Sequence, residues 1–92
     1  MSLEQVRAFV VIADAGSIGR GAERLHISQP PLTRKLRALE DELGATLFVR
    51  TPRGVRLSPA GVRFMDHALR ILDAVDDAER AFRGGSSALE PS

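Results

Sequence analysis

The stretch SQPPLTRKLRALEDELG, residues 28–44, predicts one helix with a marked start. The adjacent prolines Pro30 and Pro31 would break a helix interior, because each lacks an N–H group and its ring clashes with the preceding turn. In the first turn the N–H groups have no partner within the helix, so proline is tolerated there. Leucines then recur at spacings of four, three and four residues, the pattern of one buried face: Leu32, Leu36, Leu39 and Leu43. We therefore expect a helix over 29–43, with Ser28 as its N-cap.

Two shorter helices are expected upstream. Apolar residues recur at helical spacing over 3–15, and a capping-box pattern begins at Ser2. Ser17 is placed to cap a second helix that ends near Leu25. Residues 26–28 separate this helix from the next one. Two helices joined by so short a break form a helix-turn-helix.

A hairpin and a long helix are expected downstream. Residues 47–57 have the pattern of two short strands, and residues 51–54, which include proline and glycine, are typical of the turn between them. Pro59 suits the first position of a further helix. No strong helix breaker follows until about residue 82, which predicts a helix about 36 Å long.

The expected fold is mainly α: a winged helix-turn-helix with a three-helix core and a two-stranded wing, followed by a long helix. The predicted organisation is a winged domain over 1–58, a linker and dimerisation helix over 59–83 and a flexible tail over 84–92. A chain of 92 residues suffices for one small domain.

Composition excludes several classes of protein. The chain is 43% hydrophobic and 27% charged, as ordinary globular domains are. It has no cysteine, which excludes disulfides and thiolate metal sites. It has no apolar run of about 18 residues, so no membrane span is expected. The N-terminus lacks the features of a signal peptide, and a cytoplasmic location is therefore expected.

Charge is distributed unevenly along the chain. Residues 17–63 carry nine basic and four acidic side chains, a net charge of +5, whereas residues 64–92 carry a net charge of −3. A basic middle is typical of a protein that binds a polyanion. Chance segregation of solvated charges gives the same pattern, so charge alone does not decide between the two interpretations.

The start of the third predicted helix carries side chains suited to reading DNA base edges in the major groove. Gln29 can bond an adenine edge or a phosphate, and Arg34 can pair with guanine or bind a phosphate. Thr33 can hydrogen-bond a base or contact a thymine methyl group. Pro30 and Pro31 present a rigid apolar surface suited to thymine methyl groups. Each residue alone is equally consistent with a solvent-facing role, but the set at one helix start favours DNA contact.

The predicted hairpin adds three arginines. Arg53 lies at its tip, where an arginine can enter the adjacent minor groove, and Arg50 and Arg56 are expected to contact backbone phosphates. The N-terminus of the third helix also points N–H groups and the positive end of its dipole toward a phosphate. Ser28 and Lys35 are further expected backbone contacts.

The long helix is expected to form a homodimer. Apolar residues on it repeat at alternate spacings of four and three, as in a coiled coil, and are expected to contact a partner helix: Phe64, Ala68, Ile71, Val75, Ala78 and Phe82. A second stripe is expected to pack on the winged domain: Met65, Leu69 and Leu72. The predicted product is a two-fold dimer on a pseudo-palindromic site in double-stranded DNA.

Two other classes of function, a protein-interaction module and an enzyme, are alternatives to DNA binding. A protein-interaction module is expected to have an apolar docking surface, whereas the start of the third helix is polar. For an enzyme, the sequence assembles no nucleophile–base pair, carboxylate pair or glycine-rich phosphate loop. No cofactor and no metal are expected, because His26 and His67 have no clustered partner. Both histidines are interpreted as structural or solvent-exposed, with His26 as a candidate phosphate contact.

The sequence resembles the N-terminal domain of LysR-type transcriptional regulators. The resemblance covers about residues 2–83 and is most specific over 26–61, HISQPPLTRKLRALEDELGATLFVRTPRGVRLSPAG. It implies a bacterial regulator that binds DNA as a dimer or tetramer and has a further C-terminal domain for a small-molecule inducer. It implies that the major-groove contacts are made by Gln29, Pro30, Pro31, Thr33 and Arg34. It implies a minor-groove contact by Arg53. It implies backbone contacts by Ser17, Arg50 and Arg56.

One departure from the family lies in the second predicted helix, at Gly19 and Gly21. The family usually has alanine at 21. Glycine is unfavourable in the interior of a helix. The pair either lets another helix approach closely or is simply tolerated.

Overall fold

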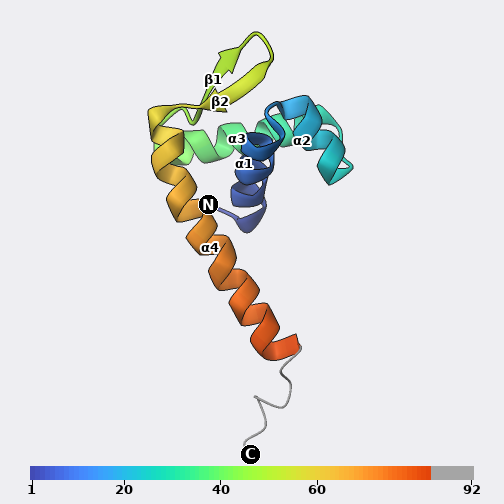
Figure 1. Cartoon of the computed structure of the whole chain (residues 1–92), viewed down its shortest axis with the longest axis vertical. Coiled ribbons are helices and arrows are strands. Elements are labelled where there is room, and N and C mark those ends of the chain that lie inside the picture. The colour runs from blue at the N-terminus through green and yellow to red at the C-terminus, as the bar shows by residue number, and fades with distance from the viewer. Residues whose placement is uncertain (84–92) are drawn as a thin grey trace, which may run out of the picture.

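The computed structural model describes residues 1–83, and the tail predicted over 84–92 lies outside the described residues. The described chain contains, in order, α1 (Leu3–Ala15), α2 (Ile18–Leu25), α3 (Gln29–Leu43), β1 (Phe48–Thr51), β2 (Gly54–Leu57) and α4 (Pro59–Arg83). Helices α1 to α3 and the antiparallel hairpin form a body from which α4 extends as a long arm (Figure 1). The expected winged helix-turn-helix fold is confirmed.

Hydrogen-bonded caps begin the first two helices. Ser2 Oγ accepts the N–H of Gln5 at 3.1 Å, and the Gln5 side chain accepts the N–H of Ser2 at 3.2 Å, which is the predicted capping box. Ser17 Oγ accepts the N–H of Arg20 at 3.1 Å at the start of α2. Both caps are local in sequence, which is why the two helices begin where the sequence predicts.

Helix α3 begins without a side-chain cap. Ser28 occupies the N-cap position in an extended conformation, but its hydroxyl makes no capping hydrogen bond. A capping hydroxyl accepts an N–H from the second or third helical residue, and here these are Pro30 and Pro31, which have none. The predicted position of Ser28 is confirmed, and its hydroxyl stays exposed.

The core lies where α1 crosses α3, the wing and α4. Phe9 is fully buried, and its ring centroid lies 5.3 Å from that of Phe48 and 5.2 Å from that of Phe64. Phe48 begins β1 and Phe64 lies in α4, so a single aromatic side chain of α1 joins both elements to the body. Offset and edge-on aromatic contacts of this kind add to the burial of apolar area.

Helix α3 packs on α1 and α2 through its leucines. Leu32, Leu36 and Leu39 are buried as predicted, whereas Leu43, in the last turn, is 37% exposed at the edge of the body. A Cβ at Gly21 would lie 3.3 Å from Ile12 Cγ1 and 3.4 Å from a methyl carbon of Leu32. Glycine at this position of α2 therefore serves the close approach of helices.

The first turns of α4 belong to the core, which corrects the predicted division of its apolar residues. Phe64 is 9% exposed and Ala68 is 0% exposed, and Met65 and Leu72 pack partly buried against the same core. At 3.6 residues per turn these four side chains lie on one helix face. Phe64 and Ala68 are thus not available to a partner helix, and the prediction was wrong for them. Leu69, expected to pack on the domain, is 47% exposed.

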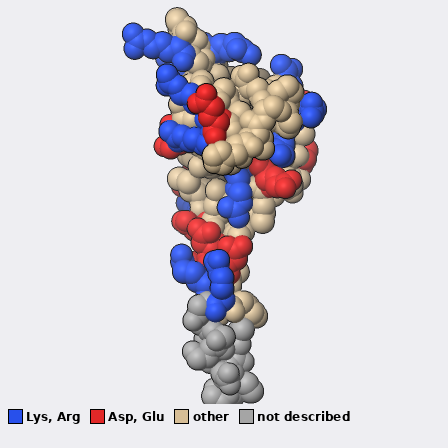
Figure 2. All heavy atoms as spheres, turned by 90° about the vertical axis from the view of Figure 1, so that its right-hand side faces the viewer, with Lys and Arg blue, Asp and Glu red and all other residues tan. Residues whose placement is uncertain are grey.

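The surface differs between the two ends of the molecule. Lys and Arg side chains project from the end that carries the wing, whereas acidic and basic side chains are mixed along α4 (Figure 2). On α4 they pair, as in Arg70–Asp66 at 2.9 Å. Within residues 1–83 no helix combines the length and apolar character that crossing a membrane requires. Nor do those residues bring together three or more side chains of the kinds that bind metal ions.

Candidate nucleic-acid interface

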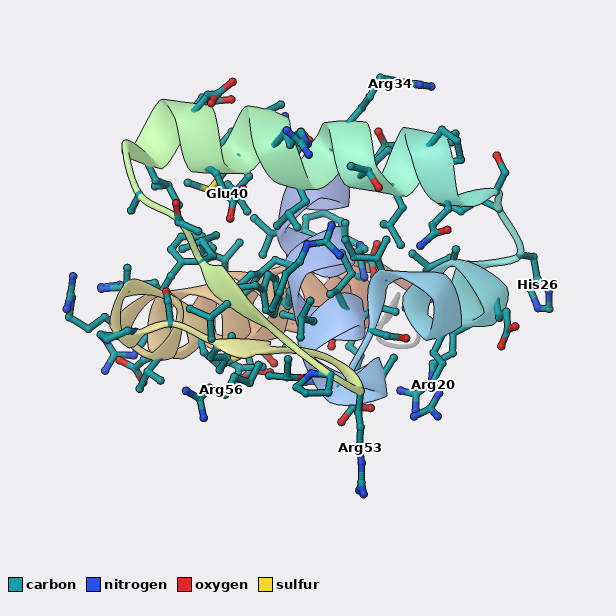
Figure 3. All side chains as sticks on the ribbon, turned by 90° about the horizontal axis from the view of Figure 1, so that it is seen from above. Arg20, His26, Arg34, Glu40, Arg53 and Arg56 are labelled. Carbon is teal, nitrogen blue, oxygen red and sulfur yellow. The ribbon has the colours of Figure 1, made fainter. Side chains whose placement is uncertain are left out.

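The predicted base-contact residues come from two elements, α3 and the hairpin, that share one face of the body. Seen from the wing side, α3 runs along one edge of this face and the hairpin tip lies at the other (Figure 3). Arg34 points outward from α3, and Arg53 points outward from the tip. Both side chains are exposed. The structure thus brings the helix start and the wing tip, which lie far apart in sequence, onto one surface.

The buried leucines set the orientation of the other side chains on α3. Gln29, Pro30 and Arg34 are exposed, and Pro31 and Thr33 are partly buried. Thr33 faces the wing, where it lines the groove between α3 and the hairpin. The first turn of α3 therefore presents the predicted polar and apolar contacts outward.

Lys35 lies on a different flank of α3. It is partly buried and borders a small hollow with Arg7 of α1, Leu25 and Ile27. Two residues along a helix correspond to a rotation of about 200°, so Lys35 and Thr33 face nearly opposite sides. The structure separates Lys35 from the residues that face the wing.

The register of the hairpin separates the wing arginines. Arg50 pairs with Val55, and Arg56 pairs with Val49. Directly opposite residues of an antiparallel pair share a face, and neighbours along a strand alternate. Arg50 therefore lies on the face toward α3, together with Phe48 and Val55. Arg56 is exposed on the other face and points away from α3 (Figure 3).

The wing is held against the turn between α1 and α2. The N–H of Val55 donates to the carbonyl oxygen of Gly16 at 2.9 Å. Gly54 has φ +147°, and a Cβ there would overlap that same carbonyl oxygen. Only glycine allows this approach of the two backbones. The contact fixes the position of Arg53, the residue before Gly54, relative to the helix-turn-helix.

Side-chain hydrogen bonds hold the base of the wing. Glu40 Oε2 of α3 accepts the N–H of Leu47 at 2.8 Å. Ser58 Oγ donates to the carbonyl oxygen of Thr46 at 2.6 Å and accepts the N–H of Gly61 at 2.9 Å. Ser58 is 7% exposed and caps α4 as expected. One buried hydroxyl thus links the start of the wing to the start of α4.

Sequence reasoning missed two basic residues on this face. Arg37 lies one turn after Thr33 on α3 and lines the same groove. Arg20, on α2, is exposed beside the wing tip (Figure 3). The spacing of four from Thr33 to Arg37 was a signal for the first residue. No local signal identifies Arg20, because its position depends on how the wing packs. Ser17, by contrast, is partly buried, and its hydroxyl already caps α2.

A helix-turn-helix with a wing docked beside its second helix defines the class of winged helix-turn-helix proteins. The chain belongs to the LysR family within that class. The family described as bacterial regulatory helix-turn-helix protein, lysR family, matches residues 3–62. The match spans α1 through the start of α4 and includes every residue of the face described above.

The chain is similar to several transcriptional regulators. HTH-type transcriptional regulator TfdT of Cupriavidus pinatubonensis is 48% identical over 94 residues, which cover 98% of this chain and 41% of TfdT. HTH-type transcriptional regulator ClcR of Pseudomonas putida is 46% identical over 86 residues, which cover 94% of this chain and 29% of ClcR. The chain spans less than half the length of these relatives.

Solved structures share the fold closely. The crystal structure of the CbnR_DBD–DNA complex superposes with a TM-score of 0.85 at 40% identity, covering 94% of this chain and 99% of that one. The BenM_DBD/benA site 1 DNA complex gives a TM-score of 0.86 at 36% identity, covering 95% and 98% of the two chains. Both cover almost the whole of this chain, the projecting helix included.

Proposed function

We propose that this chain binds double-stranded DNA sequence-specifically, as the DNA-binding part of a bacterial transcription regulator. The observation that carries the proposal is the shared face: α3 borders it on one side and the wing tip borders it on the other (Figure 3), and the Val55–Gly16 hydrogen bond holds the wing against the turn between α1 and α2. That the similar CbnR and BenM domains were crystallised with DNA supports it. The protein acts by binding rather than catalysis, in the cytoplasm, where bacterial DNA lies.

The recognition helix is α3, with its first turns in the major groove. Gln29, Thr33 and Arg34 read base edges, and Pro30 and Pro31 contact thymine methyl groups. Arg53 enters the adjacent minor groove from the wing tip. The major groove is bounded by two strands, so backbone contacts form on both flanks of the helix. They come from Ser17, Ser28, Lys35, Arg50 and Arg56.

Selection of bound sequences from a random duplex pool tests this proposal. One preferred sequence is expected, and affinity for it should fall steeply with added salt, because bound phosphates release counterions. Arg34→Ala should weaken binding by about 1–3 kcal/mol and relax the preference at one base pair. Arg7→Ala, on α1 and outside the set of proposed contact residues, is the matched control and should leave the preference intact. Enrichment of no sequence, with affinity insensitive to salt, would contradict the proposal.

A second proposal concerns assembly: two copies associate through the projecting part of α4. Beyond the core, this part carries apolar residues on a largely charged helix, and Phe82 is 67% exposed. The proposed contacts are Ile71, Val75, Ala78 and Phe82. Such a dimer presents two α3 helices to two half-sites.

Sedimentation of the chain across a range of concentrations tests the dimer. Phe82→Glu should shift the equilibrium toward the monomer without unfolding the body, because Phe82 lies far from the core. Val62→Glu is the matched control, since Val62 is 59% exposed at the other end of α4. A wild-type chain that stays monomeric on its selected DNA site would rule the dimer out.

A further inference from the structure

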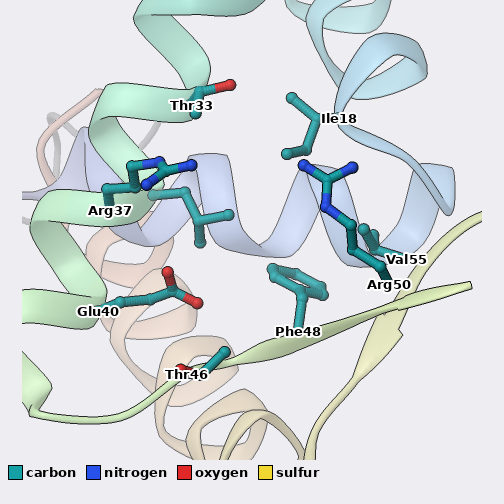
Figure 4. Close-up of a pocket in the computed structure, with 9 residues that line it drawn as sticks. Ile18, Thr33, Arg37, Glu40, Thr46, Phe48, Arg50 and Val55 are labelled. Atoms are coloured by element: carbon teal, nitrogen blue, oxygen red, sulfur yellow. The ribbon is translucent and has the colours of Figure 1, made fainter.

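A groove separates α3 from the wing, and two arginines face each other across it. The groove encloses about 280 Å³. Arg37 reaches into it from α3, and Arg50 reaches into it from β1 on the opposite wall (Figure 4). The hydroxyl of Thr33 points over the same opening (Figure 4). Ile18, Phe48 and Val55 form an apolar floor.

Both guanidinium groups are available for a ligand. Arg37 and Arg50 are exposed, and neither forms a salt bridge with a carboxylate of the described residues. Glu40 lines the other end of the groove, where its carboxylate accepts the N–H of Leu47 at 2.8 Å. The groove is therefore positive at the end near Ile18 and Thr33 and negative at the end near Thr46.

Two like charges that face each other repel, and an anion between them removes that repulsion. Guanidinium is planar and binds phosphate oxygens through two parallel N–H bonds. The apolar floor suits the sugar carbons on either side of a phosphodiester. The positive end thus matches one phosphate within a strand better than a free small molecule, which would leave the floor uncovered.

We propose that Arg37 and Arg50 bind one and the same DNA phosphate. The inference rests on the function proposed above, in which α3 lies in the major groove and Arg53 in the adjacent minor groove. Neighbouring grooves of a duplex are separated by one strand, so that strand must pass between α3 and the wing. The groove is where it passes. This phosphate contact sets the register between base readout by α3 and minor-groove readout by the wing.

A phosphate-by-phosphate substitution experiment tests the shared contact. The selected duplex is prepared with one neutral methylphosphonate at a time, and affinity is measured for the wild-type chain, Arg37→Ala, Arg50→Ala and Arg7→Ala. In wild type, one substitution between the major-groove and minor-groove contacts should weaken binding about tenfold. Arg37→Ala and Arg50→Ala should each weaken binding to the unmodified duplex about tenfold. Each variant should then be less sensitive than the wild-type chain to a methylphosphonate at that same position, because only one arginine remains to contact the phosphate.

The control, Arg7→Ala, should keep the full wild-type sensitivity. If the two variants lose sensitivity at different phosphates, or if Arg37→Ala instead relaxes the preference at one base pair, the shared contact is wrong while sequence-specific binding stands. If the wild-type chain selects no sequence, both proposals fail together. Circular dichroism of each variant verifies that the body remains folded.

Discussion

Helix α3 and the wing lie on the same face but are held there in different ways. Leu32, Leu36 and Leu39 bury one side of α3 over about two turns. The base of the wing shares the core through Phe48, whereas its tip is held by a few point contacts, chiefly the Val55–Gly16 hydrogen bond and the approach of Gly54 to the same carbonyl group. The recognition helix is therefore positioned by the hydrophobic core, and the wing tip is positioned by backbone geometry. Damage to the two should have different consequences.

Loss of a core leucine of α3 should have the largest effect. Leu32→Ala removes a fully buried side chain and should lower the free energy of unfolding by about 3 kcal/mol, because it leaves a cavity. The whole body should lose stability in one transition, which urea denaturation measures. Leu43→Ala, on the same helix but 37% exposed, should cost about 1 kcal/mol or less. Equal costs at both positions would remove the distinction between core and edge of α3.

Substitution of the wing glycine should lower the free energy of unfolding by less than loss of Leu32 does, but its effect should be confined to the wing. Gly54→Ala forces a Cβ against the Gly16 carbonyl oxygen and should cost about 2 kcal/mol. Amide exchange should accelerate at Val55 while the amides of α3 stay protected. Gly44→Ala is the matched control, because it has φ +66° with no atom within 4 Å of the added Cβ. If Gly44→Ala frees the wing equally, backbone strain rather than the close approach is responsible.

Removal of the Ser58 hydroxyl should loosen the base of the wing and the start of α4 together. Ser58→Ala loses one buried donor and one cap, and should lower the free energy of unfolding by about 1–2 kcal/mol. Ser2→Ala removes only an exposed cap and should cost about 0.5–1 kcal/mol. Thermal denaturation of both variants compares the two caps. An equal loss would show that the bond to Thr46 adds nothing.

A substitution in the turn between α2 and α3 should have the smallest effect on the free energy of unfolding, and this effect should be stabilising. His26 has φ +57°, a left-handed conformation that costs energy for any residue with a Cβ. His26→Gly should raise the free energy of unfolding by about 0.5–1 kcal/mol, because relief of this strain exceeds the entropy cost of glycine. His26→Ala keeps the strain and should show no gain. A gain for alanine would instead implicate the imidazole ring.

Local signals explain why the helices could be predicted from the sequence. The prolines at 30 and 31 mark the start of α3, and Ser2 and Ser17 cap the helices that they precede. These effects act within four residues. The strands, predicted over 47–50 and 55–57, instead run over Phe48–Thr51 and Gly54–Leu57. Their bounds depend on residues remote in sequence. Glu40 accepts a hydrogen bond from the N–H of Leu47, and Gly54 lies against the carbonyl oxygen of Gly16.

The candidate site could be predicted only in part, because local patterns place some of its residues and the packing of remote elements places the others. The outward residues at the start of α3 follow from the leucine period, and Arg53 follows from its place in the turn. The different flank of Lys35 follows from the helix period too, but only once the position of the wing is known. Arg37 became a candidate only when the structure placed it opposite Arg50. On α4, the residues that face the core depend on where α1 crosses it, which periodicity alone does not specify.

Helix α4 runs without a break from Pro59 to Arg83, and its first turns are part of the core. The rotation of α4 about its axis in the interior therefore determines which residues face each direction at the projecting end. Each residue advances the chain by about 1.5 Å and turns it by about 100°. A core substitution that rotates α4 by a fraction of a turn would also rotate whatever the far end contacts. The interior around Phe64 thus contributes to the angle and separation at which two such bodies meet a duplex, and so to the choice of binding site.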